Sequence, residues 1–231
     1  MTRIENALIR RLPVADRARL LARCEPVQLA LSAVLVEAGA QADPVFFPVD
    51  AFVSEVLGVP GHPGLEVGMI GREGMVGATR GLGVTVAPFR SVVQGAGSAW
   101  RLGGEDLDRE MLRSDALRGV VHRYLYGTMV QLGTASACRR FHALGPRLAR
   151  WLLMSHDRAH ADEFRVTHEF LGLMLGVRRV GVTLAAGALQ ATGAIRYRRG
   201  HVTVLDREGL EAQACSCYRA DLRAYRAAMR R

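Results

Sequence analysis

Residues Val166–Leu205 constrain the fold more than any other part of the chain, because their pattern predicts two short helices joined by a tight turn. Thr167 is suited to cap a helix, since its hydroxyl can accept a hydrogen bond from a free amide of the first turn. Apolar residues then recur on one helical face, and Gly176 stands where a left-handed residue ends a helix. A second helix with its own apolar stripe is predicted to begin at Arg178 and Arg179.

A basic hairpin follows this helix pair. Alternating strands at Ile195–Tyr197 and Val202–Val204 flank the turn Arg198–His201. Helix-turn-helix proteins place their second helix in the DNA major groove, and the hairpin would form a wing along the backbone. From Arg165 to the end of this turn, the chain has six arginines and a single acidic residue. A small helical core with a solvated basic rim is the alternative, but the joint pattern favours DNA binding.

The same stretch resembles the C-terminal winged helix of Crp/Fnr-type bacterial transcription regulators. The order T-x-x-x-L-x-x-x-L-G-V-x-R runs over residues 167–179, and the hairpin ends in V-x-V-x-D at residues 202–206. The resemblance implies a homodimer with an N-terminal β-roll sensor and a long dimer helix. It also implies an unknown small-molecule effector, and double-stranded DNA and RNA polymerase as partners.

The resemblance also assigns roles within the predicted reader helix. Arg179 falls where the family's base-reading arginine sits, and arginine suits the O6 and N7 acceptors of guanine. The Glu that follows in the best-known members is Val180 here, and their later Arg is Leu184, so we expect a different operator. Wing residues are expected to bind phosphates, which set affinity but not sequence preference. The predicted DNA-contacting residues are Thr167, His168, Arg178, Arg179, Val180, Thr183, Arg196, Arg198, Arg199 and His201.

Charge is distributed unevenly along the 231 residues, and every positive side chain counted in the net charge of +9 is an arginine. Residues 1–111 hold 11 arginines against 13 acids, whereas residues 112–231 hold 20 against 9. A basic half beside a near-neutral half predicts a polyanion-binding part and a second part with another role, although a protein that binds membrane surfaces would show the same total.

The N-terminus lacks the apolar core of a secretory signal, and no run of 18 apolar residues occurs, so a cytoplasmic protein without membrane partners is expected.

The N-terminal half is predicted to be all-β. Short apolar or alternating runs separated by Gly and Pro recur between Pro26 and Arg101, which is typical of a roll, barrel or sandwich. The expected strands are Val27–Leu31, Val34–Glu37, Val45–Pro48, Phe52–Leu57, Leu65–Ile70, Ser91–Gln94 and Ala99–Leu102. Residues 1–23 are expected to form a helix and its lead-in.

This half resembles the family's sensor domain as well. Phe46-Phe47-Pro48 followed by Ser54 is similar to its F-P-x-x-x-x-x-S strand pair, and Gly71–Gly77 is similar to the glycine-rich turn before the ligand-binding segment. Arg90-Ser91 falls where cyclic-nucleotide-binding members place an Arg-Ser pair on the phosphate, although Arg90 on a strand can equally be a surface residue. Those members hold the ribose with a glutamate, whereas Gly77-Ala78-Thr79 stands here, which argues against cyclic AMP. The candidate effector-binding residues are Gly77, Arg90, Ser91 and Thr128.

A long helix is predicted over Ser114–Phe141, which contains no proline. Its 4-3 spaced residues are typical of a coiled-coil seam. These seam residues are Leu117, Val121, Tyr124, Thr128, Gln131, Ala135 and Cys138. A second apolar side is formed by Val120, Leu125, Met129 and Leu132. One side would pack on the β-domain and the other on a second copy, but burial within one large domain remains an alternative.

Other chemistry finds little support in the sequence. Four clustered cysteines would be needed for an iron–sulfur sensor, but only Cys24 lies in the sensor half, and no haem signature occurs. Cys215 and Cys217 have one residue between them, unlike the two to four usual for zinc, so idle thiols and no metal or cofactor are expected. No nucleophile or paired-carboxylate motif appears, and we expect no enzyme activity.

The sequence therefore predicts an α+β protein: a jelly-roll-like β-roll sensor over 1–111, a dimerisation helix over 112–141, and a winged helix-turn-helix domain over 142–231. It is expected to be an effector-responsive homodimer that reads a palindromic DNA site and regulates transcription. The alternative is a small-molecule-binding or enzymatic β-roll protein whose helical half serves dimerisation or protein docking.

Overall fold

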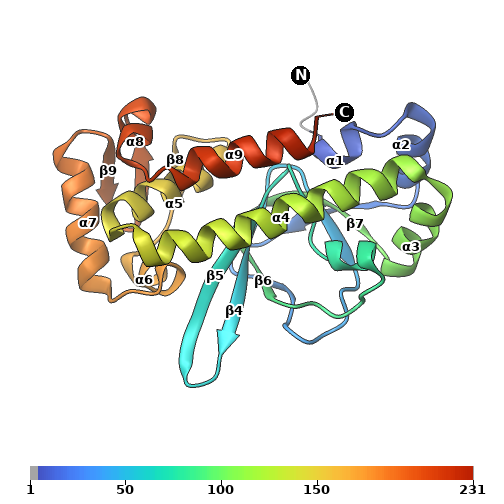
Figure 1. Cartoon of the computed structure of the whole chain (residues 1–231), viewed down its shortest axis with the longest axis horizontal. Helices are drawn as coiled ribbons and strands as arrows, with labels where there is room; N and C mark the ends of the chain where they lie inside the picture. The colour runs from blue at the N-terminus through green and yellow to red at the C-terminus, as the bar shows by residue number, and fades with distance from the viewer. Residues whose placement is uncertain (1–4, 231) are drawn as a thin grey trace.

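The N-terminal part of the computed structural model, which describes residues 5–230, is a roll of two antiparallel sheets (Figure 1). One sheet has the strand order β1-β7-β3 and the other β2-β6-β4-β5. Their strands are β1 (Glu25–Leu29), β2 (Val34–Val36), β3 (Val45–Pro48), β4 (Phe52–Val59), β5 (His62–Ile70), β6 (Arg90–Gly95) and β7 (Gly97–Leu102). All seven expected strands are present, and β3 has the predicted bounds.

The core of the roll lies between its sheets. Phe46 and Ala99 from the first sheet pack with Val53, Ile70 and Val93 from the second. The β4–β5 hairpin is longer than predicted and extends beyond the roll, as Figure 1 shows. Residues near the turn of this hairpin are exposed on both faces. The sequence therefore lacks the alternation of apolar and polar residues that predicts a strand there.

Short helices surround the roll. The single helix expected over residues 1–23 is instead two, α1 (Ala7–Arg10) and α2 (Val14–Leu21), because Pro13 has no amide hydrogen to continue the first helix and begins the second. Residues 1–4 of that prediction lie outside the described part. A 3-10 helix, η1 (Ala78–Leu82), follows the glycine-rich turn, and α3 (Gly104–Arg113) begins at the acidic run as expected.

The long helix α4 (Asp115–Phe141) agrees with the prediction, and its N-cap Ser114 accepts a hydrogen bond from the amide of Leu117. The sequence left open which of its apolar sides meets the β-domain, and the structure shows that the 4-3 spaced side does. Leu117, Val121 and Tyr124 pack inside the chain against the roll, and Ala135 and Cys138 are buried further along. The strongest apolar stripe of α4 is therefore the face that packs on the protein's own core. The exposed face of the helix is formed by other residues.

That exposed face forms a continuous stripe, here called the outer stripe. It consists of His122, Tyr126, Met129, Gly133, Ser136 and Arg140. The spacing alternates between three and four residues, as in a coiled-coil contact. Met129 is 64% exposed although its side chain is apolar.

The C-terminal part is a winged helix. Its elements are α5 (Leu144–Ala159), β8 (Glu163–Arg165), α6 (His168–Leu175), α7 (Arg179–Ala191), β9 (Ile195–Arg198), β10 (His201–Val204) and α8 (Arg207–Gln213). The three strands pair in the order β8-β10-β9. Leu148 and Leu152 of α5 pack with Leu171, Val182 and Leu189 in one core. In the described chain no single helix is long and apolar enough to cross a membrane; α6 and α7 pass that test only as a pair, bent by 107°.

The basic segment at residues 222–231 is expected from its sequence to fray. The structure instead places residues 222–228 in the last helix, α9 (Cys217–Ala228); residue 231 lies outside the described part. This helix runs back along α4 to the roll (Figure 1). There Met229 is 1% exposed within the core formed by α1, α3 and α4, and its carbonyl accepts a hydrogen bond from Arg11. The alternating Arg and Ala residues of this segment suggested a solvated end, but Tyr225 and Met229 anchor it.

Candidate functional site

The helix-turn-helix has the local chemistry that its sequence predicts. The Thr167 hydroxyl accepts a hydrogen bond from the amide of Phe170 at 3.1 Å and caps α6. Gly176 has a φ of 66°, and the amide of Val177 donates to the carbonyl of Gly172, which closes the end of α6. A Cβ on Gly172 would lie 2.9 Å from the Val177 carbonyl oxygen, so the turn requires a glycine there. The turn holds the N-terminus of α7 at the surface.

Five arginines gather on the exposed side of this domain without acidic partners. No side-chain hydrogen bond or ion pair within residues 5–230 involves the guanidinium groups of Arg178, Arg179, Arg196, Arg198 or Arg199. Arg199 and Gly200 have φ values of 50° and 80°, which form the two-residue turn of the wing. Such unneutralised guanidinium groups suit a polyanion such as the DNA backbone.

Two predicted contact residues also have roles inside the domain. His168 lies against Tyr197 with ring centroids 4.2 Å apart, and its Nδ1 is 3.0 Å from the Thr183 hydroxyl. Thr183 donates in turn to the carbonyl of Arg179 at 3.1 Å. Burial and the nearby Arg179 charge lower the pKa of His168, which favours the neutral ring. These contacts fix α7 against α6 and the wing.

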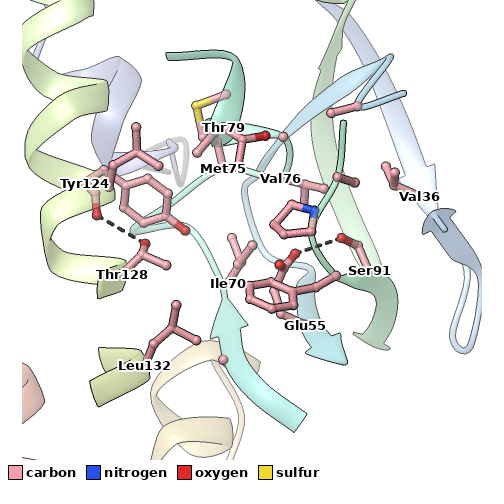
Figure 2. Close-up of a pocket in the computed structure, with 18 of the residues that line it drawn as sticks. Val36, Glu55, Ile70, Met75, Val76, Thr79, Ser91, Tyr124, Thr128 and Leu132 are labelled. Atoms are coloured by element: carbon pink, nitrogen blue, oxygen red, sulfur yellow. Dashed lines mark hydrogen bonds between the residues drawn. The ribbon is translucent and has the colours of Figure 1, made fainter. Parts of the chain in front are cut away.

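A pocket lies between the roll and α4, where three of the four candidate effector residues meet (Figure 2). Gly77, Ser91 and Thr128 line it, and it has a free volume of about 70 Å³. Tyr124 and Leu132 approach from α4, and Ile70 lies opposite on β5. Gly77 is left-handed, and a Cβ there would lie 2.7 Å from the Val45 side chain.

The fourth candidate residue, Arg90, does not line this pocket and lies at the surface, as in the alternative interpretation. Its side chain is exposed and forms an ion pair with Glu37 at 3.2 Å. Successive residues of a strand face opposite sides of the sheet. Because Ser91 points into the pocket, Arg90 points away from it.

Glu55, which sequence reasoning missed, supplies the charge of the pocket. Its carboxylate accepts a hydrogen bond from Ser91 at 2.7 Å, as drawn in Figure 2. Burial raises the pKa of Glu55 to about 7. Among the described residues that line the pocket none is cationic, and the Thr79 hydroxyl is buried without a hydrogen-bond partner. An acidic residue within an alternating strand gave no signal that distinguished it from a solvent-facing one.

A second buried carboxylate lies where the roll meets the winged helix. Glu66 of β5 is 7% exposed and accepts hydrogen bonds from Ser54 at 2.6 Å and from the Trp151 indole at 2.8 Å. Burial raises its pKa to about 7. Arg158 of α5 bonds Glu73 of the roll at 2.9 Å, and α6 packs on β5. Polar bonds and apolar packing therefore join the two parts.

Three of the four cysteines lie together in the structure. Cys138, Cys215 and Cys217 form a buried cluster at the end of α4, with His142 beside it. The C-terminal segment folds back over the α4–α5 junction and brings together residues far apart in the chain. The sequence contains only the pairs Cys138–His142 and Cys215–Cys217, neither of which is a recognisable motif alone.

Comparison with known families and structures is consistent with this architecture. Residues 146–213 match the model of the Crp-like helix-turn-helix domain. No curated protein matches the chain at a significant level.

Several solved structures share the fold over nearly their whole length. The c-di-GMP-responsive global regulator CLP of Xanthomonas campestris is 18% identical, with a TM-score of 0.66 over 83% of this chain and 99% of its own. A CRP-family transcriptional regulator of Thermus thermophilus is 20% identical, with a TM-score of 0.66 over 81% of this chain and 96% of its own. FixK2 of Bradyrhizobium japonicum is 11% identical, with a TM-score of 0.68 over 84% and 98%. The chain therefore contains a Crp-like helix-turn-helix domain over residues 146–213 and shares the overall fold of these regulators.

Proposed function

We propose that the chain acts in the cytoplasm as a homodimer that reads a two-fold symmetric DNA site through α7 and holds the flanking phosphates through the wing. The observation that carries this proposal is the group of five arginines without acidic partners around the N-terminus of α7 and the wing turn. In helix-turn-helix proteins the N-terminal residues of the second helix contact base edges. Arg178 and Arg179 are at that position here.

The exposed surface of α7 combines arginine with apolar side chains. After Arg179, its exposed side chains include the apolar Val180 and Leu184, with Thr183 as the polar residue between them. Apolar side chains contact the methyl group of thymine, whereas arginine contacts guanine. We therefore expect a half-site in which a guanine is followed by thymine-rich positions.

The outer stripe of α4 supplies the dimer contact in this proposal. The small residues Gly133 and Ser136 let a second helix approach closely, and Tyr126 and Met129 supply apolar area. Two copies of the stripe would meet about a two-fold axis, because a symmetric dimer uses the same patch on both subunits. The two α7 helices would then address half-sites about one DNA turn apart.

The effector of this proposal is a neutral or cationic molecule that enters the pocket beside Glu55. A phosphate there would meet a carboxylate and no cation, which disfavours a cyclic nucleotide. The free Thr79 hydroxyl offers a hydrogen bond to a polar group of the ligand. Because Tyr124 and Thr128 belong to α4, an occupied pocket would act directly on the dimer helix.

DNase footprinting on DNA from upstream of the protein's own gene tests this proposal. Two protected half-sites related by two-fold symmetry, and no change with cyclic AMP, are expected. Protection without symmetry would contradict the dimer, and a footprint that requires cyclic AMP would contradict the effector class.

A further inference from the structure

Four side chains at the end of α4 converge on one point. The thiols of Cys138, Cys215 and Cys217 and a ring nitrogen of His142 all lie within 4.8 Å of one another. Cys138 Sγ is 3.5 Å from Cys215 Sγ, and Cys217 Sγ is 3.6 Å from His142 Nδ1. The three cysteines are 2%, 6% and 7% exposed.

The backbone around these residues is well defined by hydrogen bonds. His142 caps the C-terminus of α4, and its amide donates to the carbonyl of Cys138 at 3.1 Å. The amide of Cys215 donates to the carbonyl of Pro146 in α5 at 3.2 Å. Cys217 is the first residue of α9. The cluster therefore joins α4, α5 and the α8–α9 segment.

The distances fit a tetrahedral ion. Zn–S bonds of about 2.3 Å and Zn–N bonds of about 2.05 Å, at the tetrahedral angle, give S–S separations of about 3.8 Å and S–N separations of about 3.6 Å. The two separations in the structure are within a few tenths of an ångström of these values. Three thiols with one imidazole form a donor set that selects zinc over magnesium or calcium.

A guanidinium group, that of Arg150, lies beside the cluster and lines the same pocket as Cys138. Three thiolates around a divalent ion carry one net negative charge, which the buried Arg150 would partly balance. Arg150 is held in place by Asp221 of α9 at 2.6 Å.

We propose that Cys138, His142, Cys215 and Cys217 bind one Zn²⁺ ion in a closed Cys3His site that ties the α4–α5 junction to the C-terminal helices. Binding releases the thiol protons to solvent and involves no redox change. With four protein ligands the site keeps no position open for a reactant, so its role is structural. It does not depend on the proposed DNA and effector contacts.

The position gives this ion mechanical importance. Cys138 and His142 lie where the sensor's long helix passes into the winged helix, and Cys217 begins the helix that returns to the roll. An ion bound to all four residues would restrict the movement between the two parts. Its removal would free the C-terminal segment at one end.

Co²⁺ titration of the full-length protein, stripped of metal under reducing conditions, tests this site. We expect one Co²⁺ per chain, with the visible bands of tetrahedral cobalt and near-ultraviolet thiolate charge transfer, and displacement by Zn²⁺. Cys24→Ser is the matched control, since Cys24 is also a free cysteine but lies in the sensor half; it should bind as the unmodified chain does. Cys215→Ser should weaken binding by at least about 100-fold, since losing only a hydrogen-bond partner of a ligand costs about 10–100-fold.

His142→Cys keeps the test decisive even where Cys215→Ser fails to fold. This variant retains four ligands, so it should bind one Co²⁺ with stronger thiolate charge transfer. A spectrum identical to that of the unmodified chain would overturn the assignment of His142. Absence of stoichiometric Co²⁺ binding would overturn the site. A disulfide between Cys138 and Cys215 in the metal-free protein, detected because both resist alkylation until it is reduced, would also overturn it.

Discussion

At the scale of single residues, the environment of a charged side chain decides its role more than its identity does. Arg90 and Glu55 are both charged and lie on neighbouring strands, but Arg90 faces solvent and Glu55 faces the pocket. The resemblance to cyclic-nucleotide-binding proteins pointed to the arginine. Which residues of a strand face the pocket depends on the register of that strand, because successive side chains point to opposite faces. The register could not be predicted from the sequence.

Arg179→Ala should weaken specific DNA binding by about 1–3 kcal/mol and relax the preference at one base position, because a bidentate contact to guanine is lost. Arg198→Ala in the wing is the comparison. It should weaken all sequences alike and reduce the salt slope by about 1, as the loss of one phosphate contact does. Competition binding with single-base variants of the site measures both. An equal loss on every sequence for Arg179→Ala would make it a phosphate contact.

Glu66→Gln should make stability less dependent on pH. The folded state raises the Glu66 pKa from 4.5 to about 7, so it retains a proton that the unfolded chain releases. Stability therefore falls as pH rises from about 4.5 through about 7, by up to about 3 kcal/mol from this group. Gln removes that loss; its oxygen can still accept from the Trp151 indole, and its amide nitrogen can donate to the Ser54 hydroxyl in place of the present bond. Thermal unfolding at pH 5 and pH 8 measures the difference, with the exposed Glu105→Gln as control. An equal pH dependence in both variants would show that Glu66 does not titrate in this range.

At the scale of elements, most of the fold could be predicted from local pattern, and the surfaces between elements could not. The strands, the long helix and the helix-turn-helix follow from alternation, caps and glycine positions. The side of α4 that faces the roll could not be predicted, because both its inner and outer faces have residues spaced by three and four. Periodicity alone does not say which face meets the chain itself. The anchoring of α9 was missed for a similar reason, since its few apolar residues contact elements far away in sequence.

Met129→Glu should dissociate the proposed dimer. It places a charge in the middle of the outer stripe, where two copies would bring like charges together in an apolar contact. The dimer dissociation constant should rise by at least about tenfold, measured by sedimentation equilibrium. Val14→Glu is the matched control, because Val14 is an exposed apolar residue of α2, away from the stripe. A dimer that tolerates Met129→Glu would place the interface elsewhere.

At the scale of the whole molecule, two helical connections join sensor and reader, the first covalent and the second by packing. One is α4 passing into α5, and the other is α9 returning from α8 to the roll, as Figure 1 shows. The same two parts are also held together by the hydrogen bond between Trp151 and Glu66 and by the packing of α6 on β5. A change in the pocket at Tyr124 or Thr128 thus acts on a helix that continues into α5 and packs along α9. In the proposed dimer, an effector bound there would shift the population between two dimer arrangements.

Fluorescence anisotropy of the purified protein on DNA from its own upstream region, compared with unrelated DNA over a salt series, tests DNA recognition most directly. Tight binding to one fragment, saturating at two protomers per site and weakening steeply with salt, is the predicted result. The arginines of α7 and the wing would then act together on one symmetric site. Weak and equal binding to all fragments, with or without added small molecules, would contradict sequence-specific reading and leave the basic face as a charged surface only.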